Sequence, residues 1–179
     1  ICQREIWLYR FECSLVKFFC SESNDFIADE NIQIHGGSGF CKGNPERQYR
    51  DSRIKRIFEG TDEINRLLAV GMLLKKASPQ KDREGKLKEP ELPLMSAIKQ
   101  VVAESMTPSM RTEPEDLVER FAYYLNNAKK AVLLVAGSAY EKFGLKLEEH
   151  QILLMSLSDC LINIYVMESV LTVFTKNRT

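Results

Sequence analysis

The sequence predicts an all-α protein, a helical bundle followed by a second, smaller helical domain. Apolar residues recur every three or four positions through most of the 179 residues, which is the spacing of one helix face. No segment alternates apolar and polar residues as a half-buried strand does, and no repeat occurs at the period of a solenoid. A charged segment at 78–91 contains two prolines and a glycine. We therefore expect a first domain at 1–77, a linker at 78–91 and a second domain at 92–179.

Within the first domain, helices are expected at 4–24, 25–34 and 62–76. The stretch HGGSGFCKGNPE before the third helix is expected to be a loop, because its four glycines and one proline stop helices and permit positive φ. A plain turn explains this stretch, and a backbone that approaches a phosphate group is the alternative. A short helix is expected after Pro45. Thr61 is the expected N-cap of the third helix, with acids in the first turn, where they suit the helix dipole.

The second domain is expected to contain three helices, at 92–106, 115–143 and 147–175. The middle helix carries the strongest apolar stripe, which steps by three or four residues from Leu117 to Ala139. The chain is therefore expected to form two bundle-like parts.

The balance of charge argues against two classes of partner. Lysine and arginine together number 25, as do aspartate and glutamate, so the formal net charge is zero. Nothing in the bulk charge therefore favours nucleic acid or an anionic membrane. No apolar run is expected to approach the ~18–20 residues that span a bilayer, and no strongly basic amphipathic helix is evident. Neither nucleic-acid binding nor membrane association is expected.

The five cysteines are odd in number and form no C-x-x-C pair, so neither a disulfide framework nor a zinc site is expected. The two histidines, His35 and His150, are far apart and lack partners at metal-ligand spacing, so no metal site is expected. Cys13 and Cys20 are seven residues apart on one helix face and are expected to be small core residues. A reducing compartment is favoured.

The segment ERQYRDSRIKR at 46–56 carries five basic and two acidic residues, which give it a local net charge of plus three. Two interpretations are open. The segment is either a solvated helix face, or a surface that faces an anionic ligand or a partner subunit.

Glu59, in the stretch RIFEGTDEINRL, is a candidate proton acceptor. It follows Ile57 and Phe58, and apolar surroundings would raise the pKa of its carboxyl group and suit it to act as a general base. The N-terminus of the helix that follows has the opposite effect, because it stabilises a carboxylate. The residue pattern leaves open which effect is larger.

Two stretches carry a resemblance to a known family: ECSLVKFFCSESNDFIADENIQIHGGSGF, and ERQYRDSRIKRIFEGTDEINRLL. The order and spacing of Q-x-H-G-G-x-G-F, R-D-x-R-I and I-F-E-G-T-x-E-I resemble the C-terminal helical domain of the acyl-CoA dehydrogenases. The resemblance implies an FAD-dependent enzyme that oxidises an acyl-CoA to the trans-2-enoyl-CoA in fatty acid β-oxidation.

The resemblance also assigns roles to individual residues. It implies that Glu59 is the catalytic base that removes the α-proton and that Gly60 contacts the acyl-CoA substrate. It further implies FAD contacts for Thr61, Asp62 and Glu63 and, from the neighbouring subunit of a homodimer, for Gln33, Ile34, His35, Gly36 and Gly37. An electron-transfer flavoprotein is the expected electron acceptor.

The region 92–179 is similar in placement and helical character to the additional domain of the very-long-chain branch, which favours a long-chain acyl-CoA as substrate. Because the chain begins at Ile1 and lacks the family's N-terminal and middle domains, it is expected to be a fragment that is inactive alone. The alternatives are a non-catalytic helical module for dimerisation or assembly, or a related flavin-dependent acyl-CoA oxidase. The expected location is the cytoplasm of a bacterium, and the alternative is the mitochondrial matrix.

Overall fold

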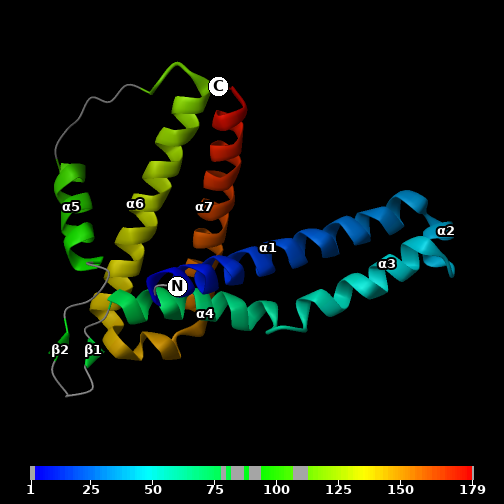
Figure 1. Cartoon of the computed structure of the whole chain (residues 1–179), viewed down its shortest axis with the longest axis horizontal. Helices are drawn as coiled ribbons and strands as arrows, with labels where there is room; N and C mark the ends of the chain where they lie inside the picture. Colours follow the sequence, from blue (N-terminus) through cyan, green and yellow to red (C-terminus); the bar gives the residue numbers. More distant parts are fainter. Residues whose placement is uncertain (1–2, 78–79, 82–86, 89–93, 107–112, 179) are drawn as a thin grey trace. The chain divides into compact units, whose positions relative to one another are not determined.

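The computed structural model describes residues 3–77, 80–81, 87–88, 94–106 and 113–178 (Figure 1). These residues are almost entirely helical, and the all-α prediction is confirmed. Their contacts group into two compact units, Ile1–Ala69 and Val70–Thr179. The division between the units lies inside α4 (Asp62–Ala77), whereas the sequence suggests a domain boundary at 78–91. The domain limits inferred from the sequence stay a prediction.

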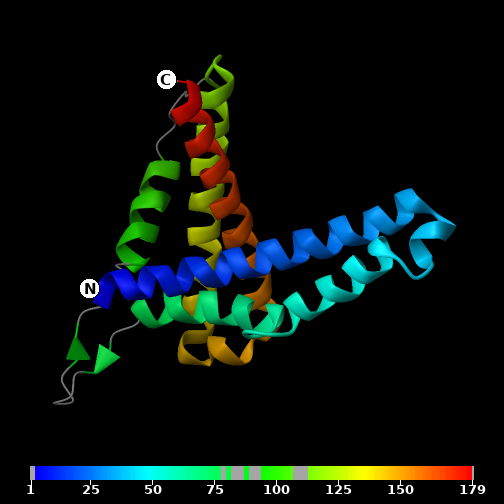
Figure 2. The same cartoon turned by 45° about the vertical axis from the view of Figure 1, so that its right-hand side comes forward.

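The first unit is a helical hairpin. Its elements are α1 (Gln3–His35), α2 (Gly37–Phe40), α3 (Asn44–Arg53), the 3-10 turn η1 (Ile54–Arg56) and the part of α4 up to Ala69. Figures 1 and 2 show α3 running back alongside α1 after the chain reverses at α2. The hairpin places η1 and the start of α4 beside the middle of α1.

The helix α1 is continuous, so the predicted break after residue 24 is wrong. Asn24 and Asp25 have the side chains of a typical N-cap. Both instead bind residues of η1, on the segment of the hairpin that runs back along α1. Lys55 Nζ donates to Asn24 Oδ1 at 3.4 Å, and Arg56 Nη1 donates to Asp25 Oδ2 at 2.8 Å. Since the sequence between residues 4 and 34 contains no glycine or proline, nothing else ends the helix.

Cys13 and Cys20 are exposed on α1, so the prediction that they are core residues is wrong. The buried positions are the next residues along the chain, Ser14 and Ser21. Each serine hydroxyl donates to a main-chain carbonyl of the preceding turn at 2.9 Å, and these bonds let a polar side chain occupy the buried face. The buried face of α1 is thus turned by one residue from the face that the cysteines share.

The glycine-rich stretch ends α1, as predicted, but it is not a loop throughout. Gly36 takes a φ of +58°, which glycine adopts without steric cost, and Gly37–Phe40 then form a single helical turn. The helix α3 begins with Pro45 in its first turn, which confirms the expected short helix.

The second unit is a three-helix arrangement of α5 (Leu94–Met106), α6 (Leu117–Phe143) and α7 (Gln151–Arg178), with the 3-10 segment η2 (Gly144–Glu149) between the last two. Both α5 and α7 pack against α6 (Figure 2). Ion pairs support each contact, from Lys130 to Glu104 of α5 at 2.6 Å and from Lys129 to Glu168 of α7 at 2.5 Å. The three predicted helices are confirmed, with the last one beginning a few residues later than expected.

A short antiparallel strand pair lies in the segment predicted to be a linker. It joins β1 (Gln80–Lys81) to β2 (Leu87–Lys88), with Gln80 opposite Lys88. The sequence shows no alternation of apolar and polar residues here, because a pair of two-residue strands is too short to show one. The rest of the predicted linker lies outside the described residues.

The helix α7 is more apolar than the sequence pattern suggested. Gln151–Asn177 contains an 18-residue window with a mean hydropathy of 1.5, so by length and composition alone this helix could cross a membrane. The expectation that no run approaches this length was wrong. Four of the polar residues in this helix donate their hydroxyl groups to main-chain carbonyls four residues earlier, namely Ser156, Ser169, Thr172 and Thr175.

The contact between α5 and α6 depends on the absence of a side chain at Gly137. A Cβ atom added there would lie 2.1 Å from Ile98 Cδ1 and 2.9 Å from its Cγ1. We predict that Gly137→Val lowers the free energy of unfolding by about 1–3 kcal/mol, the usual cost of overpacking a core. In the Ile98→Ala background the same change should cost clearly less. Urea unfolding of the four variants measures this coupling, and an equal cost in both backgrounds would contradict it.

Candidate active site

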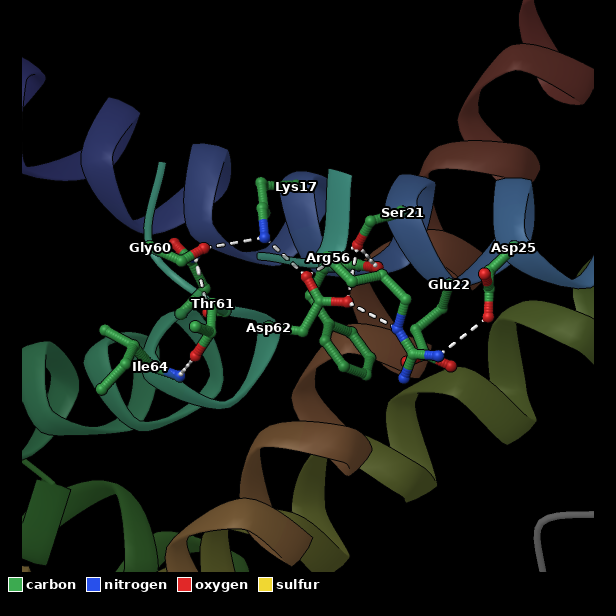
Figure 3. Close-up of polar contacts among 11 residues, drawn as sticks. Lys17, Ser21, Glu22, Asp25, Arg56, Gly60, Thr61, Asp62 and Ile64 are labelled. Atoms are coloured by element: carbon green, nitrogen blue, oxygen red, sulfur yellow. Dashed lines mark hydrogen bonds and ion pairs between the residues drawn. The ribbon is translucent and has the colours of Figure 1, made fainter. Parts of the chain in front are cut away.

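A buried carboxylate at the start of α4 organises the first unit. Asp62 is only 2% exposed, and its Oδ1 lies 2.6 Å from Lys17 Nζ of α1. The hydroxyl of Ser21, one turn further along α1, lies 2.7 and 2.9 Å from the two carboxylate oxygens. Arg56 Nε of η1 is 3.4 Å from Oδ2 (Figure 3). Asp62 therefore joins three segments of the chain, and two cations compensate its buried charge.

Arg56 faces α1 and α4. Its Nη1 lies 2.8 Å from Asp25 Oδ2, and its Nη2 pairs with Glu22. Partial burial disfavours the charged guanidinium, but the hydrogen bond to Asp25 and the charges of Glu22, Asp25 and Asp62 outweigh it, so the pKa of Arg56 is raised. Neither interpretation of the basic segment 46–56 holds for Arg56, because this cation is used inside the unit.

The two residues that lead into α4 both have positive φ, 55° for Glu59 and 83° for Gly60. The Gly60 carbonyl accepts hydrogen bonds from Lys17 Nζ and from Asn65 Nδ2, each at 2.8 Å. Asn65 Nδ2 also donates to the Thr61 carbonyl at 3.1 Å. Since a carbonyl oxygen has two lone pairs, the Gly60 carbonyl is saturated. Its N–H and α-carbon are the groups of Gly60 that remain for a ligand.

Thr61 caps α4 as predicted, because its Oγ1 accepts a hydrogen bond from the Ile64 N–H at 3.3 Å. The pKa of the neighbouring Glu63 is lowered, first by a hydrogen bond from its own main-chain N–H and then by the Thr61 hydroxyl. Glu63 is exposed, whereas the carboxylate of Asp62 is committed to partners inside the protein. The FAD contacts expected of Thr61, Asp62 and Glu63 stay a prediction.

Glu59 projects from the first unit as an exposed side chain. Ile57 and Phe58 beside it are also exposed, at 52% and 48%, so the described residues do not supply the apolar surroundings expected for Glu59. Among the described residues, Glu59 is the one non-glycine residue with positive φ. This conformation costs an L-residue about 1–2 kcal/mol. Such strain persists where the surrounding structure holds it, and it is concentrated at functional sites.

The glycine-rich end of α1 is open. Gln33, Ile34, His35, Gly36 and Gly37 are all exposed. A Cβ atom added at Gly36 or Gly37 would meet nothing within 4 Å, so the main chain is accessible to a bulky polar group. The His35 Nδ1 lies 2.8 Å from the Asn31 carbonyl, which can only accept, so Nδ1 carries the hydrogen.

The structure does not bring the two groups of predicted site residues together. The Glu59–Gly60 turn is attached to the middle of α1 through Lys17, whereas the glycine-rich stretch follows the end of α1. From Ser21 to His35 the helix rises by about 20 Å, at ~1.5 Å per residue. The two groups from one copy of the chain therefore cannot touch the same small chemical group.

Two family models match parts of this chain. Residues 3–73 and residues 127–178 each match a family model described as the acyl-CoA dehydrogenase C-terminal domain. The two stretches together make up more than half of the chain. The chain belongs to the acyl-CoA dehydrogenase family.

Particular relatives match over different lengths. A probable acyl-CoA dehydrogenase of Bacillus subtilis (strain 168) is 44% identical over 163 residues, which are 90% of this chain and 26% of that protein. The crystal structure of an acyl-CoA dehydrogenase complexed with FAD from Bacillus anthracis matches 93% of this chain and 26% of its own, with a TM-score of 0.81 and 43% identity. The mitochondrial short-chain specific acyl-CoA dehydrogenase of Bos taurus is 48% identical over 65 residues, 36% of this chain and 16% of that protein. The chain thus spans about a quarter of the first two.

Sequence reasoning missed the residues that bind Asp62 and the Gly60 carbonyl, namely Lys17, Ser21 and Asn65. One signal was available, because Lys17 and Ser21 are four residues apart and so share a face of α1. The sequence could not show that this face meets the start of α4, which lies 45 residues beyond Lys17.

We predict that Asp62→Ala destabilises the chain by about 3–5 kcal/mol, because breaking the buried ion pair leaves Lys17 without its carboxylate partner, whereas Arg56 keeps Asp25 and Glu22. Asp29, an exposed acid of α1, provides the matched control, and Asp29→Ala should change the free energy of unfolding by less than about 0.5 kcal/mol. Urea unfolding followed by circular dichroism gives both values. Equal effects of the two changes would mean that Asp62 does not organise the unit.

Proposed function

We propose that this chain provides the catalytic base and part of the FAD-binding surface of an acyl-CoA dehydrogenase. The observation that carries the proposal is the exposed carboxylate of Glu59. It lies on the strained Glu59–Gly60 turn, in which the Gly60 carbonyl accepts hydrogen bonds from Lys17 and Asn65. Because the chain spans about a quarter of its relatives, the activity is assigned to the complete enzyme and not to these residues alone.

In the proposed reaction, the Glu59 carboxylate takes the proton from the α-carbon of the acyl-CoA thioester. Bound FAD would supply the two-electron oxidant for the β-hydrogen, so that loss of both hydrogens leaves the trans-2-enoyl-CoA. Gly60 contributes a contact to the substrate through its N–H or α-carbon, since its carbonyl is already saturated. The exposed position of Glu59 supports this role, because a base must reach the proton that it removes.

The residues of the glycine-rich end fit a contact with FAD. The open space around Gly36 and Gly37 would allow a pyrophosphate to approach the main chain. The separation of about 20 Å along α1 supports a homodimer in which Gln33, Ile34, His35, Gly36 and Gly37 of one subunit reach the FAD of the other. Thr61, Asp62 and Glu63 would contact the FAD of their own subunit, Asp62 through its main chain.

We also propose that the substrate is a long-chain acyl-CoA of β-oxidation and that an electron-transfer flavoprotein accepts the electrons. The proposed location is the cytoplasm of a bacterium. The second unit supports the substrate assignment by its likeness in placement to the additional domain of the very-long-chain branch. Initial rates with acyl-CoAs of increasing length test the substrate. Oxygen consumption without an added acceptor would instead indicate an oxidase.

We predict that Glu59→Gln in the complete enzyme retains FAD but bleaches the flavin about 10²–10⁴-fold more slowly on anaerobic addition of acyl-CoA, because the general base is lost. Stopped-flow absorbance of the flavin measures this rate. The control Glu149→Gln changes an exposed acid of η2 and should bleach at the wild-type rate. A wild-type rate in Glu59→Gln would place the base elsewhere.

We predict that Gly37→Leu loses bound FAD while the chain remains folded. A Cβ atom added at Gly37 would meet nothing within 4 Å, so we expect the chain to accommodate the leucine side chain and the bound FAD to be displaced by it. Gly71 in α4 also has open space around its α-carbon, and Gly71→Leu is the matched control. The flavin-to-protein absorbance ratio after purification, together with the circular dichroism spectrum, distinguishes lost flavin from lost structure. Full flavin content in Gly37→Leu would remove this stretch from the site.

A further inference from the structure

We propose that Lys17 is a positioning residue for the catalytic base, which it holds in place through the carbonyl of Gly60. The inference rests on the proposed function of Glu59. Lys17 is 43 residues from Gly60 in sequence, and the resemblance to the family, although its first stretch contains Lys17, assigns no role to this residue.

The first step of the argument is that the Glu59–Gly60 turn needs to be held. Both residues have positive φ, and for Glu59 the alternatives with negative φ are lower in energy. A strained residue keeps its conformation only when its surroundings determine it. The carboxylate of Glu59 can keep a fixed direction only if the backbone of the turn, including the Gly60–Thr61 peptide, is fixed.

The second step is that two donors fix this peptide from different directions. Asn65 Nδ2 reaches the Gly60 carbonyl from α4, five residues further along the chain, so this bond ties the turn to its own helix. Lys17 Nζ reaches the same oxygen from α1, 43 residues away in sequence. Lys17 thereby sets the direction of the turn relative to the long helix that carries the rest of the unit.

The third step is that Lys17 itself is held firmly. Its side chain is 18% exposed, and its ammonium group lies 2.6 Å from the carboxylate of Asp62, which is 2% exposed. Ser21 and Arg56 bind the same carboxylate, so Asp62 is fixed independently of Lys17 (Figure 3). A charge-assisted hydrogen bond of this kind is shorter and stronger than a neutral one. Lys17 is therefore a rigid link between Asp62 and the Gly60–Thr61 peptide.

The test uses the complete enzyme and Lys17→Met, which keeps the length and the apolar stem of the side chain but removes the donors. We expect kcat per bound flavin to fall about 10–100-fold, since a displacement of about 1 Å has effects of this size. KM should change by less than about 3-fold, because the interaction is needed in the transition state more than in substrate binding. Lys17→Arg keeps charge and donors and should recover part of kcat.

A second variant guards against simple misfolding. Lys17→Met leaves the buried charge of Asp62 with one cation fewer, which by itself destabilises the unit. The double variant Lys17→Met/Asp62→Asn removes that charge as well, and the single variant Asp62→Asn retains the Lys17 bond to Gly60. We expect the double variant to be as slow as Lys17→Met, and Asp62→Asn to be faster than both. Lys99, an exposed lysine of α5, provides the control Lys99→Met with wild-type kinetics.

The rate-limiting step gives an additional readout. With acyl-CoA deuterated at the α-carbon, single-turnover bleaching in the Lys17→Met variant should show an isotope effect at least as large as in the wild type, because removal of the α-proton is the step that is slowed. A double variant with kcat per bound flavin within about 2-fold of wild type, in an enzyme that Glu59→Gln inactivates, would overturn the role of Lys17. A Glu59→Gln enzyme with normal turnover would overturn the proposed function and this role with it.

Discussion

The first unit depends on one buried carboxylate. Taking the Asp62 side chain out of water carries a penalty of several kcal/mol, and that penalty is tolerable only with cations and hydrogen-bond donors at close range. Lys17, Ser21 and Arg56 meet this requirement from α1 and η1. Because each partner must reach the same two oxygens, the contact determines where α4 begins relative to α1. The position of every residue in the turn before α4 follows from that geometry.

The backbone conformation of the Glu59–Gly60 turn is unfavourable by itself, and the surrounding hydrogen bonds maintain it. Glu59 and Gly60 both adopt positive φ, and the Gly60 carbonyl is held by two donors from separate helices. A less strained path into α4 would direct the carboxylate of Glu59 elsewhere. The structure thus uses the stability of a buried ion-pair network to maintain an unfavourable backbone conformation where a carboxylate is to be presented.

The length of α1 explains why the site residues form two groups. The helix is continuous from Gln3 to His35, so it separates Ser21 from His35 by about 20 Å. A carboxylate held at its middle and a glycine-rich end therefore cannot act on the same group within one copy. The resemblance to the family is the reason for proposing that a second subunit completes the FAD site, and this separation is compatible with that proposal.

The sequence by itself determined the helical class, the cap at Thr61, the helix after Pro45 and the motif around Glu59. These features depend on local periodicity, capping and φ preferences, which a short stretch of residues specifies. Only the tertiary structure decided that α1 continues past Asn24 and that Asp62 is buried. The reason is that the partners in these contacts lie more than 30 residues apart, so no local pattern encodes them. For the same reason the sequence did not indicate Lys17, which binds both Asp62 and the Gly60 carbonyl.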